Sequence, residues 1–322
     1  MKQSEHIRAF LIHLGSNMWR KKDGPFHGIR HYDDATYKPT MCCQKDVWKK
    51  VTDFLPSCGI NTLIIDMGEG VRLDRHPEIA IPGSWSKEEF REELARLRSI
   101  GLCPIPKFNF SCGHNAWMQD YGNMVGTKIY YDFCRDVVEE TIEMFDTPPY
   151  FHLGLEEEDY TSQKAHAIAV IRSPEKKTED ALWLFDICRS HGVRPWIWAD
   201  FESFGGPEAF SQKVPKDVII STWYYGMIRD GMSADKLPES VKMMNTTVEL
   251  GYDLVPTSST WSWHLNSKDT MMYCRDHVHM SRVMGFMTAP WFLTIAEKYY
   301  ALLNDAFTFG NAYRDIFEDG NQ

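Results

Sequence analysis

The sequence lacks the features that mark membrane proteins and nucleic-acid-binding proteins. It has no run of about 18 apolar residues, and Met1–Arg8 leads into a strand-like segment without the apolar core of a signal peptide. Basic residues are fewer than acidic ones, 35 against 45, so the net charge is −10, and no basic stripe is visible. A nucleic-acid backbone or an anionic membrane would on average repel such a chain. We therefore expect no nucleic-acid partner, no membrane partner and a cytoplasmic location.

Paired-cysteine and glycine-rich phosphate motifs are also missing. The eight cysteines form no Cys-x-x-Cys pair and lie mostly in apolar patterns, which favours buried free thiols in a reducing compartment over a disulfide framework. Neither Gly-x-Gly-x-x-Gly nor Gly-x-x-x-x-Gly-Lys-Ser/Thr occurs. The sequence therefore predicts no nucleotide cofactor, and we expect no cofactor of any other kind.

The sequence does contain a repeated unit, an amphipathic helix followed by a stop and a short apolar run. The stop is a glycine at positions 59, 101, 192, 251 and 285, where a helix C-cap would be expected. The apolar runs are Ala9–Leu14, Thr62–Asp66, Cys103–Phe110, Tyr150–Gly154, Pro195–Ala199, Val218–Thr222, Asp253–Thr257 and Gly285–Trp291. Further helices are expected at about 131–145, 235–250, 269–284 and 295–317.

Eight strands alternating with about eight helices in 322 residues predict an α/β fold, a (β/α)8 TIM barrel that forms a single domain over 1–322. A doubly wound open sheet is the alternative, but it usually has fewer strands and often a glycine-rich turn. The longest connections follow the strands, as in Gly15–Cys43 and Leu155–Lys176. Functional residues are therefore expected at the carboxyl ends of the strands.

Acidic and aromatic side chains gather at these expected strand ends. The acids are Asp66 and Glu69 after the second strand, Glu156, Glu157 and Glu158 after the fourth, and Asp200 after the fifth; the aromatics are Trp198, Trp223, Tyr225, Trp261 and Trp291. Glycoside hydrolysis uses two carboxyl groups, and flat sugar faces pack on aromatic rings. A general acid in this acid run would need a pKa raised by burial and by its neighbouring carboxylates.

Three segments resemble glycoside hydrolase family 20, the β-N-acetylhexosaminidases. These are the stretch from Asn61 (NTLIIDMGEGVRLDRHPEIAIPGSW), PIPKFNFSCGH at 104–114, and YFHLGLEE at 150–157, which is similar to the His-x-Gly-Gly-Asp-Glu signature of that family. The resemblance implies that Glu157 is the general acid/base and that Glu156 orients the 2-acetamido group of the substrate. It also implies that Arg8 binds sugar hydroxyls, that His114 and His152 support the site, and that Trp198, Trp223 and Trp291 surround the sugar.

The sequence departs from the family pattern at several positions. Glu156 replaces an aspartate, Leu155 replaces the second glycine, and Lys107 stands where the family has a glutamate. Strand seven lacks the tyrosine that bonds the acetamide carbonyl. A relative that cleaves another glycoside, with Glu156, Asp200 or Asp66 as its second carboxylate, therefore stays open.

Two other functions remain as alternatives. A metal-dependent sugar isomerase or epimerase could use Asp66, Glu69, Glu157 and Asp200 as ligands, although no His-x-His follows the first strand, so we expect no metal. A non-catalytic carbohydrate-binding barrel would share the aromatic residues. The expected partner in either hydrolytic or binding function is an oligosaccharide. A homo-oligomer is compatible with the sequence, because the long loops or a second subunit would have to complete the site.

Overall fold

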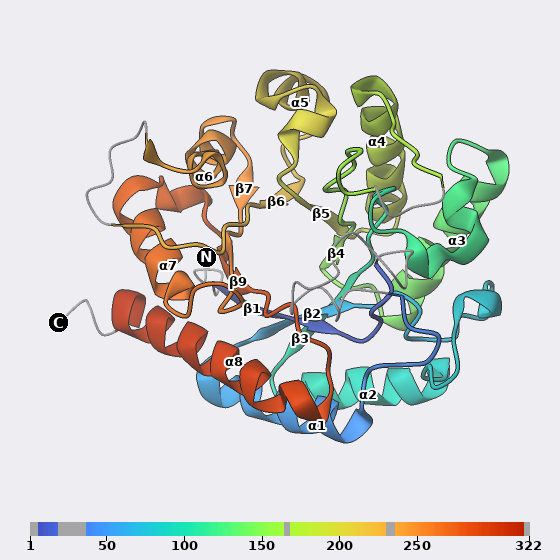
Figure 1. Cartoon of the computed structure of the whole chain (residues 1–322), viewed down its shortest axis with the longest axis horizontal. Helices are drawn as coiled ribbons and strands as arrows, with labels where there is room; N and C mark the ends of the chain where they lie inside the picture. Colours follow the sequence, from blue (N-terminus) through green and yellow to red (C-terminus); the bar gives the residue numbers. More distant parts are fainter. Residues whose placement is uncertain (1–5, 19–36, 164–167, 230–235, 319–322) are drawn as a thin grey trace.

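The computed structural model describes residues 6–18, 37–163, 168–229 and 236–318. In this part of the chain, one sheet of nine parallel strands is surrounded by eight α-helices (Figure 1). The strands are β1 (Ile7–His13), β2 (Thr62–Asp66), β3 (Cys103–Lys107), β4 (Tyr150–His152), β5 (Arg194–Trp198), β6 (Ile219–Ser221), β7 (Asp253–Leu254), β8 (Thr257–Ser258) and β9 (Gly285–Thr288). The helices are α1 (Lys45–Phe54), α2 (Lys87–Ser99), α3 (Lys128–Met144), α4 (Pro174–Ser190), α5 (Pro207–Lys213), α6 (Glu239–Glu249), α7 (Asn266–His277) and α8 (Tyr299–Tyr313).

The sheet closes on itself through the short strands β7 and β8, which are two pieces of the seventh expected strand. β7 pairs with β6, and β8 pairs with β9. Between them, the N–H of Val255 donates to the Ile220 carbonyl at 2.9 Å, and the carbonyl of Pro256 accepts from Met287 at 2.9 Å. One segment therefore bonds to strands on both of its sides, which makes eight strand positions in a closed barrel. The predicted TIM barrel is confirmed.

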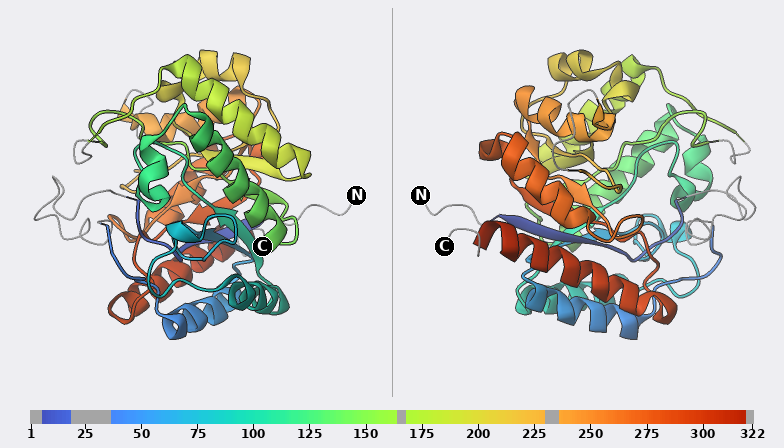
Figure 2. Two further views of the ribbon diagram at one scale, coloured as in Figure 1. Left: turned by 90° about the vertical axis from the view of Figure 1, so that its right-hand side faces the viewer. Right: turned by 60° about the vertical axis from the view of Figure 1, so that its left-hand side comes forward.

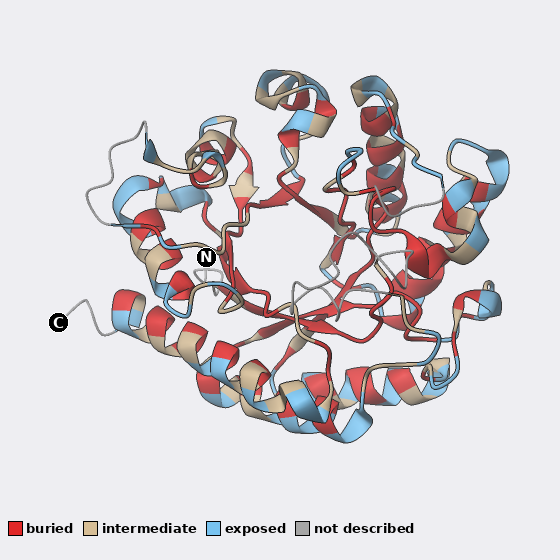
Figure 3. Cartoon of the chain, in the orientation of Figure 1, coloured by how far each residue is buried: buried red, intermediate tan, exposed pale blue. Residues whose placement is uncertain are grey.

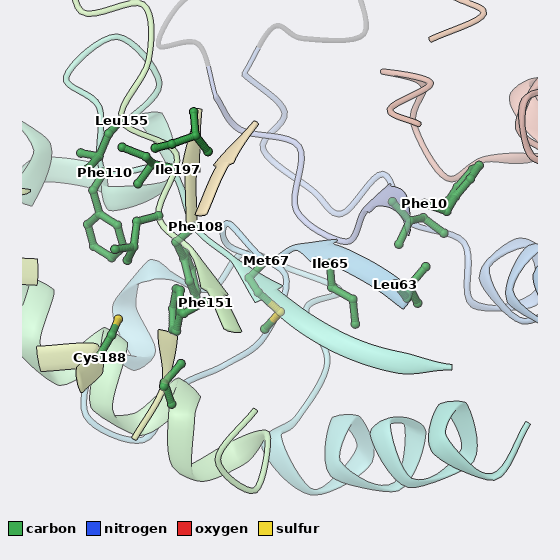
Figure 4. Packing of buried hydrophobic residues seen from close by; sticks show 14 of the residues in the cluster. Phe10, Leu63, Ile65, Met67, Phe108, Phe110, Phe151, Leu155, Cys188 and Ile197 are labelled. Carbon is green, nitrogen blue, oxygen red and sulfur yellow. The ribbon is translucent and has the colours of Figure 1, made fainter. Parts of the chain in front are cut away.

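Two hydrophobic layers explain why this sequence forms a barrel. Alternate strand residues such as Leu11, Ile64 and Ile105 fill the interior, while their neighbours pack outward against the helices. Figure 4 shows the outer layer, where side chains including Leu63, Ile65 and Phe108 lie between strands and helices. In Figure 3 most of the strand surface is buried, with β7 partly intermediate, and each helix has a buried face and an exposed face. The views in Figure 2 show the helices on the outside from two further directions.

Local signals read from the sequence have mixed outcomes. Ser86 caps α2, because its hydroxyl accepts a hydrogen bond from the N–H of Glu89 at 3.1 Å. The helix expected at 269–284 instead ends at His277, and a 3-10 turn at Met280–Arg282 follows. The chain leaves the helix there because Val283 forms a bridge with Leu254 beside the barrel.

All eight cysteines are free, and five of them are buried. Among the described residues, no helix combines the length and the apolar character needed to cross a membrane.

Candidate active site

The register of the sheet aligns four polar side chains at the carboxyl end of the barrel. Along the ladder, His13 pairs with Asp66, Asp66 pairs with Lys107, and Lys107 pairs with His152. The interior residues two positions earlier, such as Leu11, are apolar. Because side chains alternate along a strand, these four residues, which we call the polar row, point into the barrel one layer above its apolar filling.

Charges in the polar row are buried and paired. Lys107 has no exposed surface, and its Nζ lies 2.7 Å from Oδ2 of Asp66, which is also 3.5 Å from Nδ1 of His13. Burial, together with the charge of Lys107, holds the pKa of His152 well below its usual value. His152 is therefore neutral, and its Nδ1 accepts a hydrogen bond from the Gly154 N–H at 3.2 Å.

The turn that follows β4 is held by Asn109, just past β3. Oδ1 of Asn109 accepts from the N–H of Ser111 at 3.0 Å and from the N–H of Leu155 at 3.3 Å. Gly154 and Leu155 both have positive φ, 71° and 70°. A Cβ at Gly154 would lie 2.3 Å from Oδ1 of Asn109, so only glycine fits between the two loops.

This turn presents Glu156 and Glu157 on either side of His114. Oε1 of Glu156 accepts from Nδ2 of Asn109 at 2.7 Å and lies 3.3 Å from Nδ1 of His114, while Oε2 of Glu157 lies 3.2 Å from Nε2 of His114. Glu156 is 7% exposed, and the side chain of Glu157 is 44% exposed. Oε2 of Glu156 is buried, and none of the described residues hydrogen-bonds it. It is an acceptor that a ligand could use.

The protonation of this trio differs from the sequence-based expectation. Burial lowers the pKa of His114, but hydrogen bonds to Glu156 and Glu157 and their charges outweigh it and raise the pKa to about 9. Burial raises the pKa of Glu157, but the His114 cation outweighs it, so the pKa of Glu157 is lowered. The expectation of a raised pKa is wrong for this state, because the neighbour that dominates is a cation.

Glu158 and Asp200 lie in a separate set of ion pairs. Glu158 accepts from Nε of Arg172 at 2.7 Å and lies 3.4 Å from Nζ of Lys177, and both cations are buried. These two cations, through their charges, outweigh burial and lower the pKa of Glu158. Asp200 accepts from the backbone N–H of Glu157 at 3.0 Å. Glu158 is therefore neutralised and adds no uncompensated charge beside Glu157.

Aromatic rings form a continuous wall that begins at β5, the strand next to β4. Trp198 is 2% exposed, and its ring centroid lies 4.7 Å from that of His152. The ring-to-ring distances along the wall are 5.8 Å for Trp198–Trp223, 6.1 Å for Trp198–Trp291, 6.3 Å for Tyr225–Trp291 and 6.3 Å for Tyr225–Trp261. The structure thus brings together all five aromatic residues selected from the sequence.

The wall contacts the polar row at both ends of that row. The ring centroid of Trp291 lies 5.7 Å from that of His13, and that of Trp198 lies 4.7 Å from that of His152. Burial, above all, raises the pKa of Tyr225 well above 10, and the negative charges of Glu157 and Glu156 raise it further. The wall therefore lies at the same end of the barrel as the acids.

Two residues selected from the sequence lie elsewhere. Arg8 is near the amino-terminal end of β1; its Nε donates to the Gly59 carbonyl, and its guanidinium lies 5.3 Å from the ring centroid of Tyr313. The placement of Arg8 at the sugar is wrong, because β1 runs from Ile7 to the site at His13, and Arg8 is at the opposite end.

Glu69 is fully buried beneath the loop after β1. Its two carboxylate oxygens accept from the N–H groups of Ser16 at 2.9 Å and Asn17 at 3.2 Å. Burial raises its pKa to about 7, although these hydrogen bonds oppose the shift. Glu69 holds the backbone of this loop instead of pointing at a ligand.

Sequence reasoning overlooked His13 and Asn109 as members of the site. Both had a readable signal: His13 ends the first apolar run, and Asn109 lies two residues after Lys107, the spacing that keeps a side chain on one face of an extended segment. The contacts of Asn109 with the turn after β4 come from the packing of two loops, which the sequence does not show.

The acids considered as metal ligands are each engaged separately. Asp66 pairs with Lys107, Glu69 binds two backbone N–H groups, Glu157 contacts His114, and Asp200 binds the Glu157 backbone. Within the described ranges, no three His, Cys, Asp or Glu side chains are grouped as a metal would require.

Comparisons with known proteins identify the fold. Neither protein-family models nor curated proteins match the sequence. Among solved structures, a β-N-acetylhexosaminidase from Bacteroides fragilis is similar with a TM-score of 0.61 and 13% identity, over 94% of this chain and 65% of that one, so the chain is shorter than that enzyme. The catalytic modules of the pneumococcal exo-β-D-N-acetylglucosaminidase StrH (0.62, 15%, 97% and 84%) and dispersin B (0.57, 13%, 97% and 99%) are also similar. The chain therefore has the barrel fold seen in glycoside hydrolase family 20 enzymes.

Proposed function

We propose that the protein is a glycosidase that removes a terminal or near-terminal sugar, such as a β-N-acetylhexosamine, from an oligosaccharide. One observation carries the proposal: adjacent carboxyl groups after β4, Glu156 and Glu157, lie on either side of His114 at the barrel end where the aromatic wall contacts the polar row. Two carboxyl groups beside a surface for flat sugar rings meet the basic needs of glycoside hydrolysis. The fold shared with family 20 enzymes supports the same reaction class.

Glu157 is proposed as the general acid/base. Its side chain is the more exposed of the two, as a group that must reach a glycosidic oxygen requires. In the ligand-free state the proton of the His114–Glu157 pair is on His114. Protonation of the leaving oxygen therefore calls for a proton to return to Glu157 once a sugar excludes water and changes the charge balance.

Glu156 is proposed to orient the substrate. Its Oε1 is fixed by Asn109, and its buried Oε2 needs a donor such as an acetamide N–H or a hydroxyl. An acetamide held there would supply the nucleophile from the substrate itself. A plain sugar would require the protein to supply the second carboxylate, and Glu156 is then the candidate.

The remaining site residues are proposed to bind the sugar. Trp198, Trp223 and Trp291 form the inner part of the wall, and Tyr225 and Trp261 extend it outward. Tyr225 places a phenol near the acids, where strand seven lacks the tyrosine of the family. His152 and Asp66 form the polar floor beneath the sugar.

Hydrolysis of a panel of aryl glycosides tests this proposal. The panel contains a β-N-acetylglucosaminide, a β-N-acetylgalactosaminide, plain β-hexosides and a uronide, each with wild type, Glu157→Gln and the exposed-site control Glu202→Gln. We expect turnover of an N-acetyl substrate that falls by about 10² to 10⁴ in Glu157→Gln and stays at the wild-type level in the control. Binding of sugars without any turnover by the wild type would replace this function with that of a carbohydrate-binding barrel.

We also propose that the protein works in a reducing compartment such as the cytoplasm, because its eight cysteines are all free. Protein isolated without reductant and then denatured should show eight titratable thiols. Fewer thiols, restored by a reductant, would contradict this location.

A further inference from the structure

We propose that Asp200 is a positioning residue that holds the backbone of Glu157, and that it is not a sugar ligand. The proposal rests on the function proposed above. Oδ2 of Asp200 accepts from the Glu157 N–H at 3.0 Å and from Oγ of Ser203 at 2.7 Å, and it lies 3.3 Å from Nζ of Lys177. Only 18% of the Asp200 side chain is exposed. Because one oxygen serves three protein donors, its lone pairs are already directed into the protein.

The backbone of Glu157 has an unfavourable conformation that neighbouring residues must stabilise. Its φ is +53°, a left-handed conformation that non-glycine residues adopt rarely and keep only where the surroundings enforce it. The loop after β3 packs against the next peptide, where a Cβ at Gly113 would lie 2.3 Å from the Glu157 carbonyl oxygen. Asp200 at the peptide before the Glu157 Cα and Gly113 at the peptide after it therefore define where the Glu157 backbone lies.

Asp200 is itself fixed by a chain of ion pairs that joins α4 to the segment between β4 and α4. Lys177 lies between Asp200, at 3.3 Å, and Oε2 of Glu158, at 3.4 Å. Arg172 binds Glu158 through two bonds of 2.7 and 3.0 Å and reaches Asp180 at 3.0 Å. Buried charges of alternating sign resist displacement, because moving one leaves its partner uncompensated. The carboxylate of Asp200 is therefore held in one position, and its hydrogen bond fixes the orientation of the Glu157 N–H.

The consequence concerns acid catalysis. With its backbone fixed on both sides of its Cα, the Glu157 side chain is directed at His114. Loss of the Asp200 bond would let the turn relax and move the carboxyl group away from the glycosidic oxygen. Protonation of the leaving oxygen would then become slower, which is the same step that is lost when Glu157 itself is replaced.

Leaving-group dependence provides the test. Phenyl and 2,4-dinitrophenyl glycosides of the sugar that the wild type cleaves are compared through kcat/KM, which reports cleavage of the glycosidic bond. Phenol needs protonation to leave and dinitrophenol does not, so Glu157→Gln should lose about 10² or more on the phenyl substrate and only a few-fold on the other. Asp200→Ala should show the same contrast, with about 10- to 100-fold loss on the phenyl substrate.

Two further variants separate positioning from general damage. Asp200→Asn retains an oxygen that can accept from the Glu157 N–H, and it should restore most of the phenyl activity. Asp200→Glu keeps the charge beside Lys177 but moves the oxygen by one methylene, so it should show the leaving-group contrast even if Asp200→Ala does not fold. Glu202→Ala, an exposed acid in the same turn, is the control and should match wild type.

Equal losses on both substrates in the Asp200 variants, or no loss, would overturn the proposal while Glu157→Gln still shows the contrast. A wild type that cleaves no glycoside would remove the proposed function and, with it, this role for Asp200.

Discussion

The two ends of the barrel differ in how far their paired charges are exposed to solvent. At the amino-terminal end, Arg194 pairs with Asp253 at 2.7 Å, and both side chains are 26% exposed. At the carboxyl end, the pair of Lys107 and Asp66 has the same separation, but the two side chains are 0% and 7% exposed. Since removing charges from water costs several kcal/mol per ion, the buried pair is the expensive one.

This difference indicates that the features that lower the free energy of unfolding lie at the carboxyl end of the barrel. The amino-terminal end contains ion pairs that water can also satisfy, as in a surface that only has to be soluble and well packed. The carboxyl end collects buried charges, left-handed residues such as Leu155 and Glu157, and the unbonded Oε2 of Glu156. Such features gather where a ligand completes the interactions.

The largest effect is expected from breaking the buried pair of the polar row. Lys107→Met leaves the Asp66 carboxylate buried without its cation, and we expect the free energy of unfolding to fall by about 3–5 kcal/mol. Urea unfolding monitored by tryptophan fluorescence measures it. Adding Asp66→Asn to this variant should recover part of the loss. A change below about 1 kcal/mol in Lys107→Met would show that the two ends are energetically alike.

A smaller effect is expected from Glu156→Gln. The amide replaces one acceptor with a donor, so an acetamide N–H would lose its partner at Oε2. We expect kcat/KM for an N-acetylhexosaminide to fall by about 10², and kcat/KM for a plain hexoside, if cleaved, to change much less. Steady-state kinetics on the two substrates give the ratio. Equal losses on both would mean that Glu156 does not read the acetamide.

The next prediction concerns the pH dependence of kcat/KM in a variant of His114. His114→Gln removes the cation that lowers the pKa of Glu157, so that pKa should rise toward its usual value. In the wild type the proton of the His114–Glu157 pair is lost only with the pKa of His114, about 9. In His114→Gln that proton must reside on Glu157 alone and is lost with the lower pKa of a carboxyl group, so the alkaline limb of the kcat/KM profile should move to lower pH. A limb that stays at the wild-type pH would show that another group sets it.

Stability provides an independent check on His114. Its folded pKa, about 9, lies above its usual value of 6.5, so the stability that it contributes is complete below pH 6.5 and is lost as the pH rises to 9. His114→Gln should flatten the stability profile in that window. The window overlaps only between pH 6.5 and 7 with that of Glu69, whose folded pKa of about 7 makes stability fall as the pH rises from 4.5 to 7.

The fold could be predicted from the sequence because its signals are local. Glycine stops and apolar runs locate the strands, and Ser86 begins α2 as the pattern indicates. The break between β7 and β8 was not predicted, because the apolar run is continuous in the sequence. The break falls at Pro256, which has no backbone N–H to donate to a neighbouring strand.

The site was only partly predictable because its electrostatics depend on distant residues. Glu156, Glu157 and the aromatic residues follow from the motif and from strand ends. The position of His114 between two carboxylates depends on how the loop after β3 folds over the turn after β4, which no local pattern encodes. The family resemblance placed Arg8 at the sugar, whereas the direction of β1 puts it at the opposite end of the barrel.

The smallest effect is expected at the amino-terminal end. Arg194→Met breaks the pair with Asp253, but water can solvate both groups and Asp253 keeps a contact with Arg282 at 3.3 Å. We expect the free energy of unfolding to change by about 1 kcal/mol or less and kcat/KM to stay at the wild-type value. Urea unfolding beside Lys107→Met measures the contrast under one set of conditions. A loss as large as that of Lys107→Met would show that the burial of an ion pair does not determine its contribution to the free energy of unfolding in this barrel.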